Sequence, residues 1–220
     1  MKLVNRLGLN ILLVVFTFCQ VNAQQYLDPE YIKVTQERGA KIVKGLGLND
    51  PAKADVVTEI IAKQYQSLSK IQDGRDAQIE AVKKGELSEE KQNKKIEKLK
   101  AKADKKIGKL HESYVKQLSA HLNEEQVGGV KDGMTYGVLP KTYKAFLEMI
   151  PSLTQEEKEY IYNNLIEARE HAMDGGSSHE KHAWFGKYKG RINNYLSARG
   201  YDLEKEREGW YKRIEEAKKK

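Results

Sequence analysis

In the stretch SEEKQNKKIEKLKAKADKKIGKLHESYVKQLSAH (Ser88–His121), apolar residues recur every three or four positions. That spacing places them in one stripe on a helix and does not suit a strand. The remaining positions are mostly lysine and glutamate, which is typical of a face exposed to solvent. The stripe continues one residue beyond the stretch and consists of Ile96, Leu99, Ala103, Ile107, Leu110, Tyr114, Leu118 and Leu122. We therefore predict a long amphipathic helix.

A second stripe lies just upstream and matches the first. It falls within Pro51–Lys84 and consists of Val56, Ile60, Ile61, Tyr65, Leu68 and Ile71. Because a long amphipathic helix needs a partner to cover its apolar face, we expect an antiparallel helical hairpin that turns near Gly85 and Glu86. The chain has only four prolines, and helical patterns continue downstream. The prediction is an all-α helical bundle.

Helix boundaries are marked by capping residues. Asn49, Ser88, Asn123 and Thr154 each follow a leucine and can cap a helix N-terminus, and Gln126 and Glu157 stand where the last two of these would complete capping boxes. Further helices are expected over 141–150, 154–172, 178–199 and 202–218, the last of them strongly charged and loosely docked. Between the caps, Gly128–Gly137 holds four glycines in ten residues, which predicts a glycine-rich loop.

The first residues have the features of a secretory signal peptide. Lys2 and Arg6 precede an apolar core, Leu9–Phe18, and Ala23 ends a small-residue cleavage site. The apolar run is shorter than the about 20 residues that a spanning helix needs. We predict cleavage near Ala23, a periplasmic or secreted protein that does not span a membrane, and a single all-α domain over residues 24–220.

The cysteine content and the net charge limit the classes of function that the chain can have. The only cysteine, Cys19, lies in the predicted signal peptide, and the bulky Phe18 before it does not suit a lipoprotein. The remaining chain would have neither disulfides nor a catalytic thiol. Its net charge falls from +7 to +5 when Lys2 and Arg6 are removed. Because an exported protein rarely meets nucleic acid and no recognition motif is present, we expect no nucleic-acid partner.

MDGGSSHEKHAWFGKYKGR (Met173–Arg191) differs most from the rest of the chain. Gly175 is predicted to end one helix in a left-handed conformation. Ser177 is predicted to cap the next helix, with Glu180 completing a capping box. The aromatic residues that follow fall at the core spacing of that helix: Trp184, Phe185 and Tyr188.

The same stretch also suggests a carbohydrate site. Aromatic rings can pack on a sugar, and lysine or arginine can pair with the carboxylates of an acidic polysaccharide. We predict that the site lies between this stretch and Lys131–Tyr136, and that it binds without catalysis. The candidate ligand-binding residues are Lys131, Asp132, Tyr136, Asp174, His179, His182, Trp184, Lys187, Tyr188 and Arg191.

Two other chemistries have weaker signals. His179 and His182 are three positions apart with Asp174 upstream, a set that would suit zinc. The zincin spacing is absent, however, and Lys181 and Lys187 place positive charge nearby, so no metal or other cofactor is predicted. No nucleophile elbow, phosphate loop or dinucleotide fingerprint occurs. An enzyme acting on polysaccharide stays a third alternative, without assigned catalytic residues.

Three stretches resemble a domain-of-unknown-function family of secreted bacterial helical proteins that is associated with sugar binding and polysaccharide utilisation. They are KDGMTYG (Lys131–Gly137), IPSLTQEEKEYI (Ile150–Ile161) and AMDGGSSHEKHAWFGKYKGRINNYL (Ala172–Leu196). The resemblance covers roughly Gln36 to Leu203 and implies an accessory, sugar-binding role. It carries no catalytic or ligand residue onto this chain.

A second resemblance supplies the main alternative. LNEEQ (Leu122–Gln126) is similar to the Leu-Thr-x-x-Gln motif of small periplasmic helical chaperones, with Asn123 in the threonine position. It implies a chaperone-like or structural envelope protein that binds other proteins.

Overall fold

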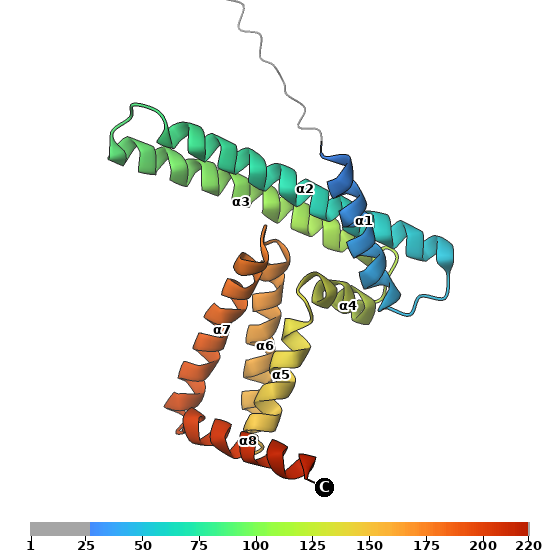
Figure 1. Cartoon of the computed structure of the whole chain (residues 1–220), viewed down its shortest axis with the longest axis vertical. Coiled ribbons are helices and arrows are strands. Elements are labelled where there is room, and N and C mark those ends of the chain that lie inside the picture. The colour runs from blue at the N-terminus through green and yellow to red at the C-terminus, as the bar shows by residue number, and fades with distance from the viewer. Residues whose placement is uncertain (1–26, 220) are drawn as a thin grey trace, which may run out of the picture.

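The computed structural model describes residues 27–219, and its regular secondary structure there is entirely α-helical (Figure 1). The predicted all-α class is confirmed. The predicted signal peptide lies outside the described residues. The helices are α1 (Pro29–Lys44), α2 (Pro51–Lys83), α3 (Glu89–Ser119), α4 (Glu124–Met134), α5 (Val138–Met149), α6 (Gln155–Met173), α7 (Ser178–Ala198) and α8 (Leu203–Lys218).

The long hairpin predicted from the two stripes is present as α2 and α3, which lie side by side along their length (Figure 1). Tyr114 and Leu118 of α3 are buried against α2, where Val57 and Ile61 are fully buried. α1 was not among the predicted helices. It crosses the hairpin so closely that a Cβ atom on Gly39 would lie 2.7 Å from the backbone oxygen of Thr58.

The predicted capping boxes of α4 and α6 are confirmed. The side chain of Asn123 accepts from the backbone N–H of Gln126, whose side chain accepts from the N–H of Asn123, and Thr154 and Glu157 make the same exchange. The cap of α2 is Asp50 rather than Asn49, because its carboxylate accepts from Ala52 and Lys53.

The predicted loop at Gly128–Gly137 is wrong over most of its length, because α4 continues to Met134. The glycines serve helix packing instead. A Cβ atom on Gly129 would lie 2.8 Å from the side chain of Leu46, and one on Gly133 would lie 2.8 Å from that of Ile42. α4 therefore turns a glycine face towards α1, and only the turn at Thr135–Gly137 separates it from α5.

The buried apolar side chains form two clusters, which define two lobes. The N-terminal lobe comprises α1–α4, and its cluster includes Ile61, Tyr114 and Met134. The C-terminal lobe comprises α5–α8, and its cluster includes Ile161, Phe185 and Ile192. The charged helix α8 crosses the far ends of α5 and α7 and buries none of its own residues completely. None of the helices in residues 27–219 is both long and apolar enough to cross a membrane.

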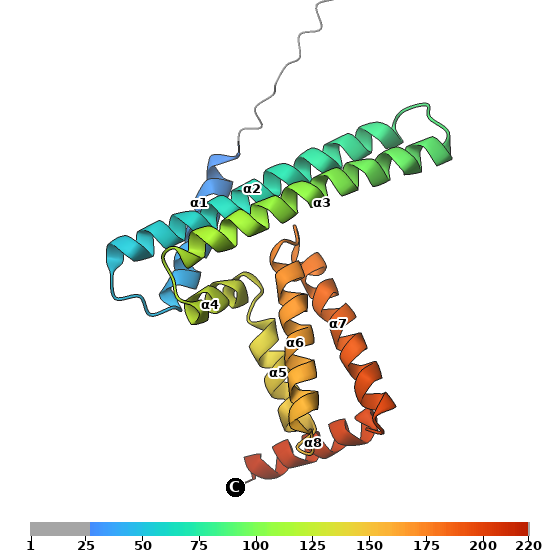
Figure 2. The ribbon, with the colours of Figure 1, turned by 180° about the vertical axis from the view of Figure 1, so that it is seen from behind.

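The lobes are set crosswise (Figures 1 and 2). The hairpin runs across one end of the molecule, and α6 and α7 approach it end-on near its middle in both views. The turn between α6 and α7 consequently lies against the hairpin, close to the end of α4. The stretch that stood out in the sequence thus occupies the junction of the two lobes.

The glycine face of α4 gives a stability prediction. Gly133→Ala should lower the free energy of unfolding by about 1–3 kcal/mol, because overpacking forces neighbours apart. Ile42 cannot give way by rotating, since its own Cβ would lie 3.3 Å from the new methyl group. Urea unfolding of both proteins measures the change.

Gly108→Ala is the matched control. Gly108 lies inside α3 with nothing within 4 Å of its Cβ position, so this variant should gain up to about 1 kcal/mol from helix propensity alone. Equal effects of the two substitutions would contradict the close α1–α4 contact.

Candidate functional site

The α6–α7 turn is fastened to the hairpin by Asp174. Its backbone oxygen accepts from Nε2 of Gln72 at 2.8 Å, and its carboxylate contacts Nδ1 of His111 at 2.8 Å. The approach is close enough that a Cβ atom on Gly176 would lie 2.5 Å from the Gln72 amide oxygen. The absence of a side chain at Gly176 therefore allows α2 to pack directly against this turn.

The predicted role of Gly175 is wrong in its detail. α6 ends at Asp174 in a right-handed conformation, and Gly175 is absent from the positive-φ residues of the described chain, whose glycines are Gly47, Gly137 and Gly200. Ser177 does cap α7, since its hydroxyl accepts from the N–H of Glu180. The Glu180 carboxylate accepts from Gly176 instead of Ser177, so the capping box is displaced by one residue.

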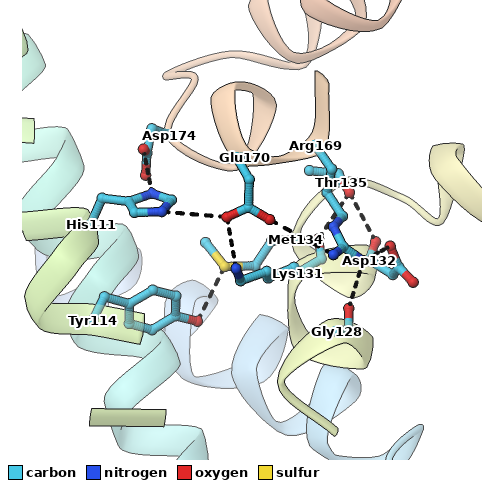
Figure 3. A network of polar contacts seen from close by, with 10 residues as sticks. All are labelled: His111, Tyr114, Gly128, Lys131, Asp132, Met134, Thr135, Arg169, Glu170 and Asp174. Carbon is cyan, nitrogen blue, oxygen red and sulfur yellow. Dashed lines mark hydrogen bonds and ion pairs between the residues drawn. The ribbon is translucent and has the colours of Figure 1, made fainter. Parts of the chain in front are cut away.

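A network of charged side chains joins α3, α4 and α6 (Figure 3). Glu170 lies at its centre, with one carboxylate oxygen 2.7 Å from Nζ of Lys131 and 3.4 Å from Nε2 of His111. Arg169 pairs with Asp132 at 2.9 Å. Two predicted ligand-binding residues, Lys131 and Asp132, are thus engaged in holding α4 to α6.

The network shifts the pKa values of its members strongly. Hydrogen bonds to Asp174 and then to Glu170 raise the pKa of His111 to about 9, although burial acts in the opposite direction. Burial favours the neutral acid in Glu170, but hydrogen bonds from His111 and Lys131 outweigh it and lower the pKa to about 2. At neutral pH, therefore, a protonated His111 lies between two carboxylates.

Beside this network lies a pocket of about 980 Å³, which we call the tyrosine pocket. It lies between α1, α2, α4, the start of α5 and the α6–α7 turn, and it is lined by Tyr31, Arg38, Tyr65, Tyr136, Lys141 and Lys181, among others. Burial raises the pKa of Tyr65 to about 12, so its phenol stays neutral. The tyrosine pocket offers aromatic rings and positive charge in one concave site.

Lys181 connects the two stretches that the sequence placed in one site. It is almost fully buried, and its Nζ donates to the backbone oxygens of Met134 at 3.2 Å and Met173 at 3.1 Å. Nearby, the rings of Tyr136 and His182 stack with their centres 5.8 Å apart. The stretches Lys131–Tyr136 and Asp174–Arg191 therefore meet.

The backbone at the pocket rim is unusual. Tyr136 has a φ of 60°, and within residues 27–219 no other non-glycine residue has a positive φ. Gly137 follows at 64°. Nζ of Lys141 donates to the Tyr136 oxygen at 3.1 Å, and the Tyr136 side chain remains 52% exposed. This left-handed turn ends α4, because the N–H of Tyr136 donates to the Gly133 oxygen at 3.4 Å and the N–H of Gly137 donates to the Asp132 oxygen at 2.8 Å.

Comparison with known families gives a match across both lobes. The profile of a family described as proteins of unknown function, DUF3826, matches residues 32–216. The chain belongs to the DUF3826 family. The match includes every member of the charged network and all residues of the tyrosine pocket except Tyr31. No curated protein matches the chain.

The predicted site residues of this DUF3826 chain fall into separate groups. Tyr136 lines the tyrosine pocket, and His182 stacks on it. Asp174, Trp184 and Lys187 line a second groove of about 650 Å³ on the other side of the turn, which we call the Trp184 groove. His179 is exposed in the first turn of α7.

Two predicted residues do not face either site. Tyr188 is 4% exposed and belongs to the core of the C-terminal lobe, which agrees with its core spacing in the sequence and leaves its ring little contact with either cavity. Arg191 covers the Tyr188 ring at 4.5 Å and pairs with Glu167 at 3.2 Å. Its position three residues after Tyr188 places it over that ring rather than at the turn.

The histidines are dispersed as well. His171 stacks on Trp184 with ring centres 4.3 Å apart, whereas His182 stacks on Tyr136. In the described part of the chain, no three histidine, cysteine or acidic side chains are grouped so that they could hold a metal ion.

The α1 side of the tyrosine pocket was not predicted from the sequence. Tyr31 and Arg38 are seven positions apart and share a helix face, but the segment carries no long apolar stripe. Tyr65 was assigned to the hairpin core because it falls in the α2 stripe, yet its ring also lines the pocket. No sequence pattern indicated a role for His111, because its partners Glu170 and Asp174 lie 59 and 63 positions away along the chain.

The charged network predicts a pH-dependent stability. The pKa of His111 in the unfolded chain is about 6.5 and in the folded protein about 9. The stabilisation by His111 is therefore complete below pH 6.5 and is lost as the pH rises through about 9. Urea unfolding of wild type and His111→Gln should show a large difference at pH 6 and a small one at pH 9.5.

The exposed His121 supplies the control for this measurement. His121→Gln should follow wild type at both pH values, because the side chain lies outside the network. A difference between wild type and His111→Gln that is the same at pH 6 and pH 9.5 would show that His111 acts by packing alone.

Proposed function

We propose that this protein is an exported, non-enzymatic carbohydrate-binding protein with an accessory role in polysaccharide utilisation. The observation that supports it most is the tyrosine pocket, where Tyr31, Tyr65 and Tyr136 line one cavity of about 980 Å³. A volume of this order accommodates an oligosaccharide fragment, since small-molecule sites typically measure about 300–1,000 Å³.

The chemistry of the pocket suits a sugar. A tyrosine presents an apolar ring face to the C–H side of a pyranose and a hydroxyl to its polar edge. The pocket also contains side chains that donate and accept hydrogen bonds, among them Ser69, Gln72, Ser177 and Ser178. This combination of a few aromatic anchors and several neutral polar groups is what a hydroxyl-rich ligand requires.

Tyr136 is the residue to which we assign the main sugar contact. Its ring is half exposed at the pocket mouth and already stacks on one side against His182. The left-handed backbone at φ 60° sets the direction of that ring. Holding a non-glycine residue in this conformation costs on the order of 1–3 kcal/mol, and at Tyr136 it forms the turn that ends α4, where the N–H of Gly137 donates to the Asp132 oxygen at 2.8 Å.

Export is proposed from the N-terminal sequence, where the charged Lys2 and Arg6, the apolar core and Ala23 have the order of a signal peptide. The absence of any cysteine after position 19 is compatible with an oxidising compartment.

The distribution of apolar surface favours this proposal over a chaperone-like role. The large exposed apolar side chains of the described chain lie on α2, the hairpin turn, the rim of the tyrosine pocket, α6 and α8: Val56, Leu87, Tyr136, Tyr162 and Tyr211. A client-binding surface would need such side chains in one contiguous patch.

A calorimetric titration tests the proposed function. Neutral and acidic oligosaccharides are titrated into wild type and into Tyr136→Ala, and a bound sugar should lose about tenfold in affinity in the variant, which is about 1.4 kcal/mol. Tyr211→Ala is the control, because Tyr211 is similarly exposed at 55% but lies on α8. It should bind as wild type does.

Trp184→Ala identifies the groove that is used. If Trp184→Ala weakens binding and Tyr136→Ala does not, the sugar occupies the Trp184 groove and the assignment to Tyr136 is wrong. Absence of heat with every oligosaccharide would contradict the proposed function itself. Chromatography of the sugars after the titration would reveal any shortened products and hence an enzyme.

A further inference from the structure

The tyrosine pocket is strongly unbalanced in charge. Its lining includes four cationic side chains, Arg38, Lys41, Lys141 and Lys181, and one carboxylate, that of Asp73. Within residues 27–219, none of the four cations forms an ion pair with a carboxylate. Most charged groups on a protein surface need no explanation, but four like charges around one cavity raise its potential and attract an anion.

Two of these cations flank one ring. The guanidinium carbon of Arg38 and Nζ of Lys181 each lie 5.8 Å from the centre of the Tyr65 ring. Arg38 is exposed on α1, whereas Lys181 is 6% exposed at the inner wall. A small anion entering the pocket along Tyr65 would therefore come near both the Arg38 guanidinium and the Lys181 ammonium.

A buried ammonium usually has a carboxylate partner, and within residues 27–219 Lys181 forms no ion pair with one. It has three N–H donors, and two of them serve the carbonyl oxygens of Met134 and Met173. Burial, reinforced by Arg38, lowers the pKa of Lys181 to about 8, although Asp174 and Glu180 act in the opposite direction. The Asp174 carboxylate is shared with His111, which lies 2.8 Å away.

We propose that Arg38 and Lys181 form an anion subsite within the tyrosine pocket, and that this subsite makes the protein selective for sugars that carry a negatively charged substituent. The inference rests on the proposed function and names the ligand class of the same pocket. Carboxylate and sulfate groups share the required chemistry, because both present oxygen acceptors to a guanidinium fork and an ammonium. Lys41 and Lys141 at the rim add long-range attraction.

The location differs from the one that the sequence suggested for acidic sugars. Lys187 and Arg191 were expected to pair with such carboxylates, but Lys187 lies over the Trp184 ring at 5.0 Å and Arg191 pairs with Glu167. The subsite is assembled instead from α1 and the first turn of α7, which meet through the contact between the two lobes.

The subsite also couples ligand binding to a proton. Near pH 8 part of the Lys181 population is neutral, and a bound anion favours the ammonium form. Binding of an acidic sugar at this pH should therefore take up protons. Asp73 is the carboxylate that lines the pocket, and Asp174 and Glu180 are the acidic groups that act on Lys181.

The test compares a trisaccharide of galacturonic acid with its fully methyl-esterified form, in which each carboxylate is replaced by a neutral methyl ester. Calorimetry at pH 7 with wild type should give at least tenfold tighter binding of the acid. Arg38→Gln should reduce that ratio to near one, whereas Lys33→Gln, an exposed α1 lysine outside the pocket, should leave the preference intact. A sulfated galactan trisaccharide in parallel distinguishes sulfate from carboxylate as the anionic group.

Proton uptake provides a readout that a purely structural Lys181 would not change. Titrations at pH 8 in two buffers of different ionisation enthalpy should show uptake with the acid and none with the ester. Lys181→Met should abolish this uptake. If that variant does not fold, the wild-type measurement and Arg38→Gln decide the question alone.

The outcomes separate the two proposals. Equal binding of acid, ester and sulfated sugar by wild type would overturn the anion subsite while leaving the carbohydrate-binding function in place. A preference for either anion that Arg38→Gln does not reduce would also overturn it. Failure of all three sugars to bind would contradict both proposals. Binding of only the sulfated sugar, lost in Arg38→Gln, would support the subsite with sulfate as its ligand.

Discussion

The arrangement of the two lobes depends on the contact between His111 on the hairpin and Asp174 at the end of α6. Each lobe has its own apolar cluster, and Met173 of α6 links them because it is fully buried in the cluster of the N-terminal lobe. The charged network adds a directional constraint to this apolar contact, because removing one partner of a partly buried ion pair leaves the other charge desolvated. Glu170 extends the constraint to α4 through Lys131.

The tyrosine pocket follows from that constraint. Its walls come from α1 and α2 on one lobe and from the α5 start, the α6–α7 turn and Lys181 on the other. If the turn were not held against Gln72 and His111, these walls would not face each other across a fixed distance. Two glycines allow the close contacts that this arrangement needs. Gly176 lets α2 approach the turn and Gly133 lets α1 approach α4, because any side chain at these positions would push the helices apart.

Prediction from sequence succeeded where the physics is local. The stripes of α2 and α3 have helical spacing, and the capping boxes at Asn123 and Thr154 depend on residues three positions apart, so both are visible without a structure. It failed at Gly128–Gly137, because glycine lowers helix propensity and the gain that outweighs this cost lies in α1, more than eighty positions upstream. At Tyr188 the helical spacing indicated the core position that the structure shows, even though the residue lies in a polar stretch.

The sequence by itself determined the all-α class, the hairpin and most helix ends, because these rest on periodicity and on contacts within one turn of helix. It also singled out Lys131–Tyr136 and Met173–Arg191 as unusual. Only the tertiary structure decided what those stretches do: Lys131 and Asp132 bind to α6, whereas Tyr136 and Lys181 join Arg38 and Tyr65 in one pocket. The reason is that ion pairs and cavity walls join residues far apart in the chain, and no local pattern encodes their distance.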